Sequence, residues 1–194
     1  NKNAIKRILN KDMKEIQKTD LSSIGIFINF DEENILQAKA MIIGPEESPY
    51  ENGILFFDIF FPHNYPFSPP NIKYYSRSIY RIHPNLYVGK SYDNFLGKVC
   101  LSVINTWTGP KWTSVMHIAS ILIILQSILN KYPIENEPGY EKTTIEKKEL
   151  FNQIVTYDTF KNLIFENIIN IPDKYLCFKK DIHNHYYLKK DIIF

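Results

Sequence analysis

Cysteine is scarce in this chain: two of its 194 residues are Cys, too few for the disulfide framework of a small secreted protein. No apolar run approaches the roughly 20 residues that a membrane-spanning helix needs, and the first residues do not resemble a signal peptide. The 23 basic and 21 acidic residues leave a net charge of +2, too small to favour nucleic acid as a partner. We therefore expect a protein of a reducing compartment, cytoplasmic or nuclear, that binds neither membrane nor nucleic acid.

The spacing of apolar residues in the first half predicts one helix followed by a sheet. Residues 2–18 carry apolar side chains at three- and four-residue steps, while lysines fill much of the remaining surface. From residue 24 the period changes to two, which is typical of strands. Strands are predicted over 24–30, 36–42, 54–61 and 72–75, the third of them apolar at nearly every position and so buried on both faces. Their short links favour a four-stranded antiparallel meander.

The second half is predicted to be helical. An apolar segment that ends near Asn130 indicates a long, largely buried helix, with Thr113 or Ser114 as its N-cap and Pro133 beyond its end. Further helices are predicted near 145–155, 157–169 and 173–189. A sheet with its helices grouped on either side of it in the sequence is an α+β arrangement. We expect a core domain over 1–142 and a helical C-terminal extension over 143–194 that packs on it.

The residues best suited to chemistry lie between the sheet and the long helix. His83, Asn85 and Cys100 stand in a stretch rich in Gly, Pro and Trp, which cannot be a regular helix or strand throughout. The chain is expected to run past itself here and to gather polar groups around one sulfur, so Cys100 is the candidate nucleophile. Cys177 is expected to be structural.

No metal site and no cofactor is expected. Cys177, His183 and His185 are near one another in the sequence, but they do not have the paired spacing of a zinc motif.

Four short motifs around Cys100 occur in a distinctive order. They are Pro66-Phe67-Ser68-Pro69-Pro70, His83-Pro84-Asn85, Gly97-Lys98-Val99-Cys100-Leu101 and Trp112. In this order they resemble the ubiquitin-conjugating enzymes, and the resemblance covers residues 3–140. The stretches 106–112 and 136–141 are similar to a narrower branch, the Z-type conjugating enzymes and the conjugating domain of the giant apoptosis-inhibitor ligases.

The resemblance implies the ubiquitin-conjugating (UBC) fold and a transfer reaction without a cofactor. Ubiquitin or a ubiquitin-like modifier would be accepted from an activating enzyme as a thioester on Cys100. It would then pass to lysine amines of a protein substrate, usually with the help of a ubiquitin ligase. An ordinary thiol has a pKa of about 8.5, so a few per cent is thiolate near neutrality and no dedicated base is required.

The resemblance also implies roles for residues near the sulfur. Asn85 would donate its amide to the oxyanion that forms during attack on the thioester; the alternative is that it only braces its loop, with the same hydrogen-bonding group. His83 is expected to order that loop rather than to move protons. Glu137 occupies a position where the family often has an acidic residue that receives the incoming lysine. A solvated loop glutamate is the competing interpretation.

Two docking surfaces are implied as well. Phe67, Ser114 and Val115 match the surface that relatives offer to ligases, although Phe67 could instead be an ordinary loop anchor. Lys2, Lys6, Arg7 and Lys14 would dock the activating enzyme; a merely solvated basic face is the alternative.

The sequence departs from the family's pattern at three places. Ile82 replaces an aromatic residue, Ser102 stands where many relatives have Asp, and residues 87–96 form an insertion beside the nucleophile. We expect the insertion to be a flap over the thioester site, unless it is a passive surface loop.

Two rival functions stay open. One is a non-catalytic UBC-fold module that regulates ubiquitin transfer, against which the presence of Cys100 argues. The other is a cysteine hydrolase that uses Cys100 with His83 or His183, for which no hydrolase signature is visible.

Overall fold

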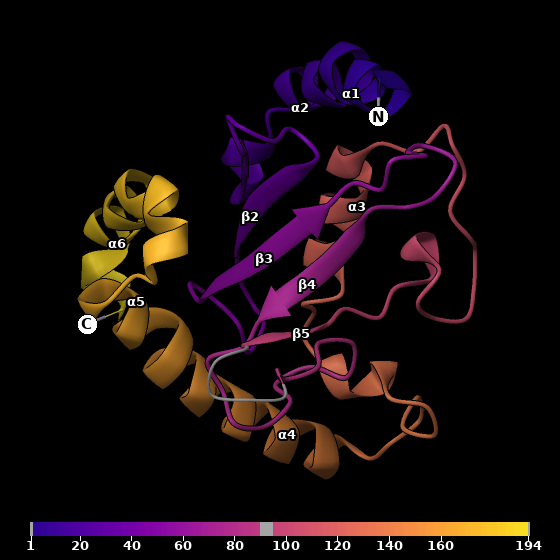
Figure 1. Cartoon of the computed structure of the whole chain (residues 1–194). Coiled ribbons are helices and arrows are strands. Elements are labelled where there is room, and N and C mark those ends of the chain that lie inside the picture. The colour runs from indigo at the N-terminus through magenta and orange to yellow at the C-terminus, as the bar shows by residue number, and fades with distance from the viewer. Residues whose placement is uncertain (1, 90–94, 194) are drawn as a thin grey trace.

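An antiparallel sheet of five strands runs through the middle of the protein (Figure 1). The computed structural model describes residues 2–89 and 95–193. Strands that follow one another in the sequence are also neighbours in the sheet. They are β1 (Ile26–Phe30), β2 (Gln37–Ile43), β3 (Ile54–Phe60), β4 (Asn71–Tyr75) and β5 (Leu96–Lys98).

The predicted meander is confirmed, with one strand more than expected. The first four strands begin and end close to their predicted bounds. β5 adds to the edge of β4, where Lys98 pairs with Lys73 and Leu96 with Tyr75. It was not predicted because so short a segment cannot show a clear alternation of apolar and polar residues.

The third strand is buried on both faces, as its apolar sequence predicts. Successive side chains of a strand point to opposite faces of the sheet. Leu55 and Phe57 therefore join the core cluster that includes α3 (Ile118–Ser127), whereas Ile54 and Phe56 join a second cluster with residues of the C-terminal helices.

The first helix matches its prediction. Residues 2–19 form one helical run, and a short 3₁₀ segment (Leu21–Ile24) then leads into β1. The run consists of α1 (Lys2–Arg7), a π-helical segment (Ile8–Asp12) and α2 (Met13–Thr19).

The predicted start of the long helix is wrong. α3 begins at Ile118, and neither Thr113 nor Ser114 caps it, because residues 113–116 form a turn instead. The backbone N–H of Ile118 donates to the carboxylate of Asp12, at 3.1 Å. A side chain from the first helix thus does the work of an N-cap, and a cap so distant in the sequence leaves no local signal.

The C-terminal region is helical as predicted, with different bounds. One continuous run replaces the two helices expected near 145–155 and 157–169, and the last helix begins later than expected. The run consists of α4 (Ile145–Asp158), a π-helical segment (Thr159–Phe165) and α5 (Glu166–Ile169); a 3₁₀ segment (Asp173–Phe178) then precedes α6 (Lys179–Ile193).

These C-terminal elements cover part of the sheet face that α3 leaves free, and α5 and α6 lie beside β2 and β3 in Figure 1. The ring of Tyr175 stacks on that of Phe56, with centroids 4.3 Å apart. The Tyr175 hydroxyl donates to Asp58 of β3 at 2.7 Å. None of the helices in the described part of the chain is long and apolar enough to cross a membrane.

Candidate active site

Cys100 and Asn85 hold each other through two hydrogen bonds. The Cys100 N–H donates to the Asn85 carbonyl at 2.9 Å, and the Asn85 side-chain amide donates from Nδ2 to the Cys100 carbonyl at 2.7 Å. The Tyr87 N–H continues this pairing with a bond to the Lys98 carbonyl, at 3.0 Å. The segment after His83 therefore runs beside the end of β5, with the Asn85 side chain bound to the backbone of Cys100.

Gly97 allows this close approach of the two segments. A Cβ atom at this position would lie 1.5 Å from the Tyr87 carbonyl oxygen, so any side chain there would push the Asn85 segment away from Cys100.

His83 is fully buried and both of its ring nitrogens bind backbone groups. Nδ1 accepts the N–H of Asn85 at 2.9 Å, which leaves Nε2 as the protonated nitrogen that donates to the Ile128 carbonyl at 2.8 Å. Burial lowers the pKa of His83 to about 4, although the bond to Ile128 acts in the opposite direction. The ring is therefore neutral at physiological pH and braces the loop that carries Asn85.

The Cys100 thiol lies in a mixed electrostatic environment. Its residue is 2% exposed, and burial raises the pKa of the thiol because a thiolate is poorly solvated there. The positive charges of Lys98 and Arg81 lower the same pKa. Burial has the larger effect, so the pKa of the thiol is raised overall, and the two cations offset part of this cost to the thiolate, the nucleophilic form.

Glu137 lies at the end of the 3₁₀ segment Pro133–Asn136, where it forms an ion pair with Arg81. The Arg81 guanidinium donates to the Glu137 carboxylate at 3.2 Å and to the Pro84 carbonyl at 3.4 Å. It also lies over the ring of Tyr87, 4.6 Å from its centroid. Arg81 thus ties Glu137 to the His-Pro-Asn loop. No local pattern marks this role, because Glu137 lies 56 residues away in the sequence.

Thr106 is a second residue that sequence reasoning missed. Its hydroxyl accepts the N–H of Leu101 at 2.9 Å and lies within hydrogen-bond distance of the Val99 carbonyl, at 2.9 Å. The Thr106 hydroxyl therefore hydrogen-bonds to the backbone on both sides of Cys100. A threonine six residues after a cysteine has no recognisable pattern by itself.

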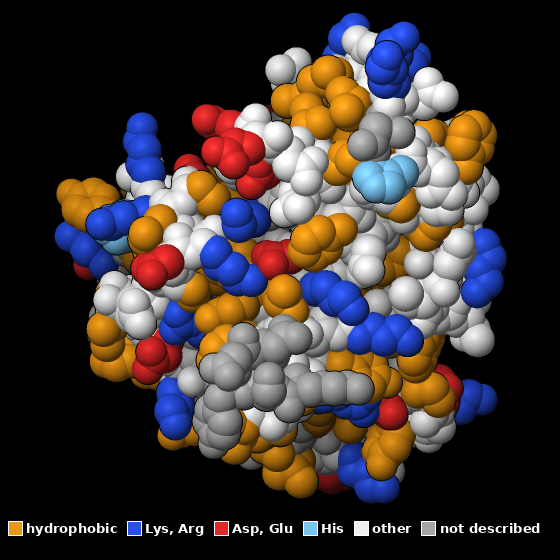
Figure 2. Space-filling view, viewed as in Figure 1, with side chains coloured by type: hydrophobic (Ala, Val, Ile, Leu, Met, Phe, Trp, Pro, Cys, Tyr) orange, Lys and Arg blue, Asp and Glu red, His pale blue; other side chains and the backbone are white. Residues whose placement is uncertain are grey.

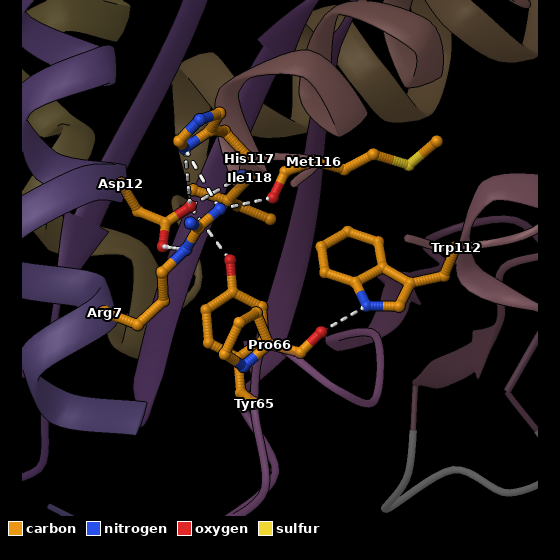
Figure 3. Close-up of polar contacts among 8 residues, drawn as sticks. All are labelled: Arg7, Asp12, Tyr65, Pro66, Trp112, Met116, His117 and Ile118. Carbon is orange, nitrogen blue, oxygen red and sulfur yellow. Dashed lines mark hydrogen bonds and ion pairs between the residues drawn. The ribbon is translucent and has the colours of Figure 1, made fainter. Parts of the chain in front are cut away.

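A buried polar cluster joins the first helix to the loops that carry Tyr65 and Met116 (Figure 3). Asp12 has no exposed surface and forms an ion pair with Arg7 at 3.3 Å. It also accepts the hydroxyl of Tyr65 at 2.9 Å, while Arg7 donates to the Met116 carbonyl at 2.8 Å. The neighbouring Trp112 donates its indole N–H to Pro66.

The residues proposed to bind a ligase extend from this scaffold into solvent. Phe67 is 78% exposed and Val115 is 76% exposed, and Ser114 is exposed as well. Phe67 is therefore no buried anchor of its loop.

The basic face of the first helix divides into two kinds of residue. Lys2, Lys6 and Lys14 are exposed, whereas Arg7 turns inward to Asp12. Arg7 thus differs from its expected partners in docking, because its charge is already paired.

Cys177 is exposed, which does not fit a cysteine packed in the core. The 3₁₀ segment that carries it buries Tyr175 and Phe178 instead. His183 is exposed on α6, and no group of three potential metal ligands occurs within residues 2–89 and 95–193.

The expected flap lies partly on residues 90–94, outside the described residues. At its two ends, Tyr87 contacts Arg81 as stated above, and the ring of Phe95 lies 5.3 Å from that of Tyr75.

The fold and the site together define a UBC-type α+β protein that holds one cysteine between the His-Pro-Asn loop and the end of a short strand. The family model "Ubiquitin-conjugating enzyme" matches residues 8–159. This chain therefore belongs to the ubiquitin-conjugating enzyme family.

Relatives from several organisms support the assignment. The chain is 38% identical over 181 residues to the human dual E2 ubiquitin-conjugating enzyme/E3 ubiquitin-protein ligase BIRC6, with 87% of this chain and 4% of that protein covered. It is 33% identical over 158 residues to the ubiquitin-conjugating enzyme E2 Z of Xenopus tropicalis, with 77% and 48% covered. The chain therefore spans about half or less of the length of these relatives.

A solved structure shares the fold. The E2 domain of a Toxoplasma gondii ubiquitin conjugating enzyme is similar to this chain with a TM-score of 0.56 and 25% identity, over 79% of this chain and 99% of that domain.

Proposed function

We propose that this chain is an active conjugating enzyme, which accepts ubiquitin or a ubiquitin-like modifier as a thioester on Cys100 and transfers it to lysine amines. The observation that carries the proposal is the pair of hydrogen bonds between Asn85 and Cys100, at 2.9 and 2.7 Å. They fix the Asn85 amide against the backbone of Cys100, within the motifs that define the family. Residues 143–194 are proposed to be an extension of the catalytic core over 1–142.

The reaction consists of two acyl transfers. The Cys100 thiolate attacks the carbonyl carbon of the activating enzyme's thioester, a new C–S bond forms, and the activating enzyme's thiolate leaves. A neutral lysine amine then attacks the new thioester, so that a C–N bond forms and the C–S bond breaks. Cys100 leaves as a thiolate, and the amine loses its proton.

Asn85 is suited to the second transfer. Its Nδ2 has two hydrogens, and one of them is used on the Cys100 carbonyl. The other is free to donate to an oxyanion that forms on the thioester carbonyl. The Asn85 Oδ1 atom is buried without a hydrogen-bond partner among the described residues.

Glu137 is proposed to receive the acceptor lysine. Its carboxylate is about one-third exposed and is paired with Arg81, so an incoming ammonium group would have to share or displace that pair. Ion pairs with this exposure are weak, worth roughly 0 to 1 kcal/mol, and such an exchange is therefore readily accessible.

The partners are proposed from the exposed surfaces. Lys2, Lys6 and Lys14 would dock the activating enzyme, and Phe67 with Val115 and Ser114 would bind a ligase. Arg7 would act indirectly, because it fixes the helix through Asp12.

The hydrolase alternative is disfavoured by His83. A general base needs a free ring nitrogen, and both nitrogens of His83 are bound to backbone groups. His183 is exposed on the C-terminal helix α6.

The test is to incubate the protein with an activating enzyme, ATP and a modifier, and to detect the adduct by mass spectrometry. Wild-type protein and Cys177→Ser should form an adduct that a thiol reductant removes. Cys100→Ser should form an ester that resists the reductant. Charging that is lost in Cys177→Ser and retained as a thioester in Cys100→Ser would refute the assignment.

A further inference from the structure

A row of polar residues crosses the sheet face that the C-terminal elements partly cover. Cross-strand pairing places Asn29 opposite Lys39, Lys39 opposite Asp58, Asp58 opposite Lys73 and Lys73 opposite Lys98. Side chains of paired residues lie on one face, so these five belong together. Phe56, two residues before Asp58, points to the same face and is the platform for Tyr175.

The C-terminal extension binds Asp58, which is the one carboxylate of this row. Asp58 accepts the hydroxyl of Tyr175 at 2.7 Å and the ammonium of Lys174 at 2.9 Å. Lys73 lies directly opposite Asp58 in the sheet, yet it forms no ion pair with it. Asp58, which faces Lys73 across the sheet, is therefore already bound to Lys174 and Tyr175.

Lys73 and Lys98 are left as two adjacent positive charges. Within residues 2–89 and 95–193, neither lysine has a carboxylate at ion-pair distance, Lys98 is exposed and Lys73 is half-buried. Like charges directly opposite each other on neighbouring strands destabilise a sheet. Figure 2 shows Lys and Arg side chains gathered over this region of β3 to β5. An anionic group bound here would relieve the repulsion.

The two lysines lie next to the nucleophile. Lys98 is two residues before Cys100, and such residues are roughly 7 Å apart along an extended chain. Lys73 is on the next strand, roughly 5 Å further across the sheet. The charge of Lys98 also reaches the Cys100 thiol, since it lowers the pKa of that group.

We propose that Lys73 and Lys98 bind an acidic segment of the protein substrate, and so direct transfer from Cys100 to lysines that have Asp or Glu nearby. The inference rests on the proposed function, since it names the class of acceptor that the thioester meets. An extended chain covers about 3.4 Å per residue, so the acidic residues would lie roughly two to four positions from the acceptor lysine.

A protein segment fits this surface better than a nucleic acid does. Asp58 interrupts the row with a negative charge, and the chain as a whole has a net charge of only +2. Binding to a phosphate backbone depends on many cations that act together, whereas a pair of lysines is sufficient for one or two carboxylates.

The first experiment measures discharge of the preloaded Cys100 thioester to two peptides. Both contain one acceptor lysine, flanked by Glu in one peptide and by Gln in the other. Wild-type protein should prefer the Glu peptide by about 2- to 10-fold in kcat/KM, as expected for one or two exposed charge pairs. The difference should lie in KM, and it should shrink with added salt. In the double variant Lys73→Gln/Lys98→Gln the ratio of the two peptide rates should fall to about one. The ratio is the readout because loss of Lys98 also acts on the Cys100 thiol and changes the rates of both peptides alike.

Lys180→Gln is the matched control, because Lys180 is an exposed lysine of α6. It should keep the full preference. Equal rates for both peptides with wild-type protein, or a preference that survives in the double variant, would overturn the proposal. Failure to form the thioester at all would instead count against the proposed function.

A second measurement is independent of charging. Fluorescence anisotropy should detect salt-sensitive binding of the labelled Glu peptide to the uncharged protein, and Lys73→Glu/Lys98→Glu should abolish it while Lys180→Glu does not. No difference between these two variants would overturn the proposal. Tighter binding of a single-stranded RNA of equal length, through the same two lysines, would also overturn the proposal.

Discussion

The buried neutral His83 should make the stability of this protein depend on pH in a predictable way. In the folded chain the pKa of His83 is about 4, whereas an unperturbed histidine in the unfolded chain has a pKa of about 6.5. The folded-state pKa is thus the lower one. Below pH 6.5 the unfolded chain binds a proton that the folded chain does not, so the stabilisation is complete above this pH and is lost as the pH falls towards 4.

The magnitude follows from the two pKa values. Each pH unit in this window contributes up to 1.36 kcal/mol, so about 2 kcal/mol should be lost between pH 7 and pH 5 through His83 alone. Replacement by Asn removes the titration and keeps a hydrogen-bond acceptor for the Asn85 N–H. The variant should be less stable at pH 7, because the bond to Ile128 and some packing are lost, at a cost of roughly 1 to 3 kcal/mol.

The assay is urea denaturation of wild-type protein and His83→Asn at several values between pH 7 and pH 5, followed by circular dichroism. Titration of carboxylates is common to both proteins and cancels in the comparison. The stability difference between them should shrink by about 2 kcal/mol towards pH 5, because only the wild type loses the contribution of His83. Parallel pH profiles would refute the reasoning, since His83 would then titrate alike in the folded and unfolded chains.

Three further predictions concern other residues. Asn85→Ala should charge almost normally, yet its discharge to lysine should be slower by about 10² to 10³, the usual effect of losing an oxyanion donor; equal defects in both single-turnover rates would mean that Asn85 only braces its loop. Asp12→Asn should lower the free energy of unfolding by roughly 3 to 5 kcal/mol, because it leaves Arg7 without its buried partner; a loss below about 1 kcal/mol in urea denaturation would contradict this. Lys6→Glu with Lys14→Glu should slow charging in a salt-dependent way and leave discharge of preloaded enzyme unchanged. Unaltered charging at low salt would show that this basic face is only solvated.

The sequence by itself determined the sheet, the family and the candidate nucleophile. Strands β1 to β4 follow from the alternation of apolar residues, a property of neighbouring residues that needs no knowledge of the fold. The motifs around Cys100 are local in the same sense, so their order was sufficient to indicate the family. The buried, two-sided character of β3 was also readable, because its apolar residues leave no polar face.

Only the tertiary structure decided which polar groups meet. Asp12 caps α3 across 106 residues of sequence, Arg7 turns inward to it, and Arg81 reaches Glu137 across 56 residues. No local pattern marks such pairs, because the partner is supplied by the fold. The same reason explains why Lys73 has no carboxylate partner within residues 2–89 and 95–193: Asp58 is its cross-strand neighbour, and Lys174 of the C-terminal extension is bound to that carboxylate.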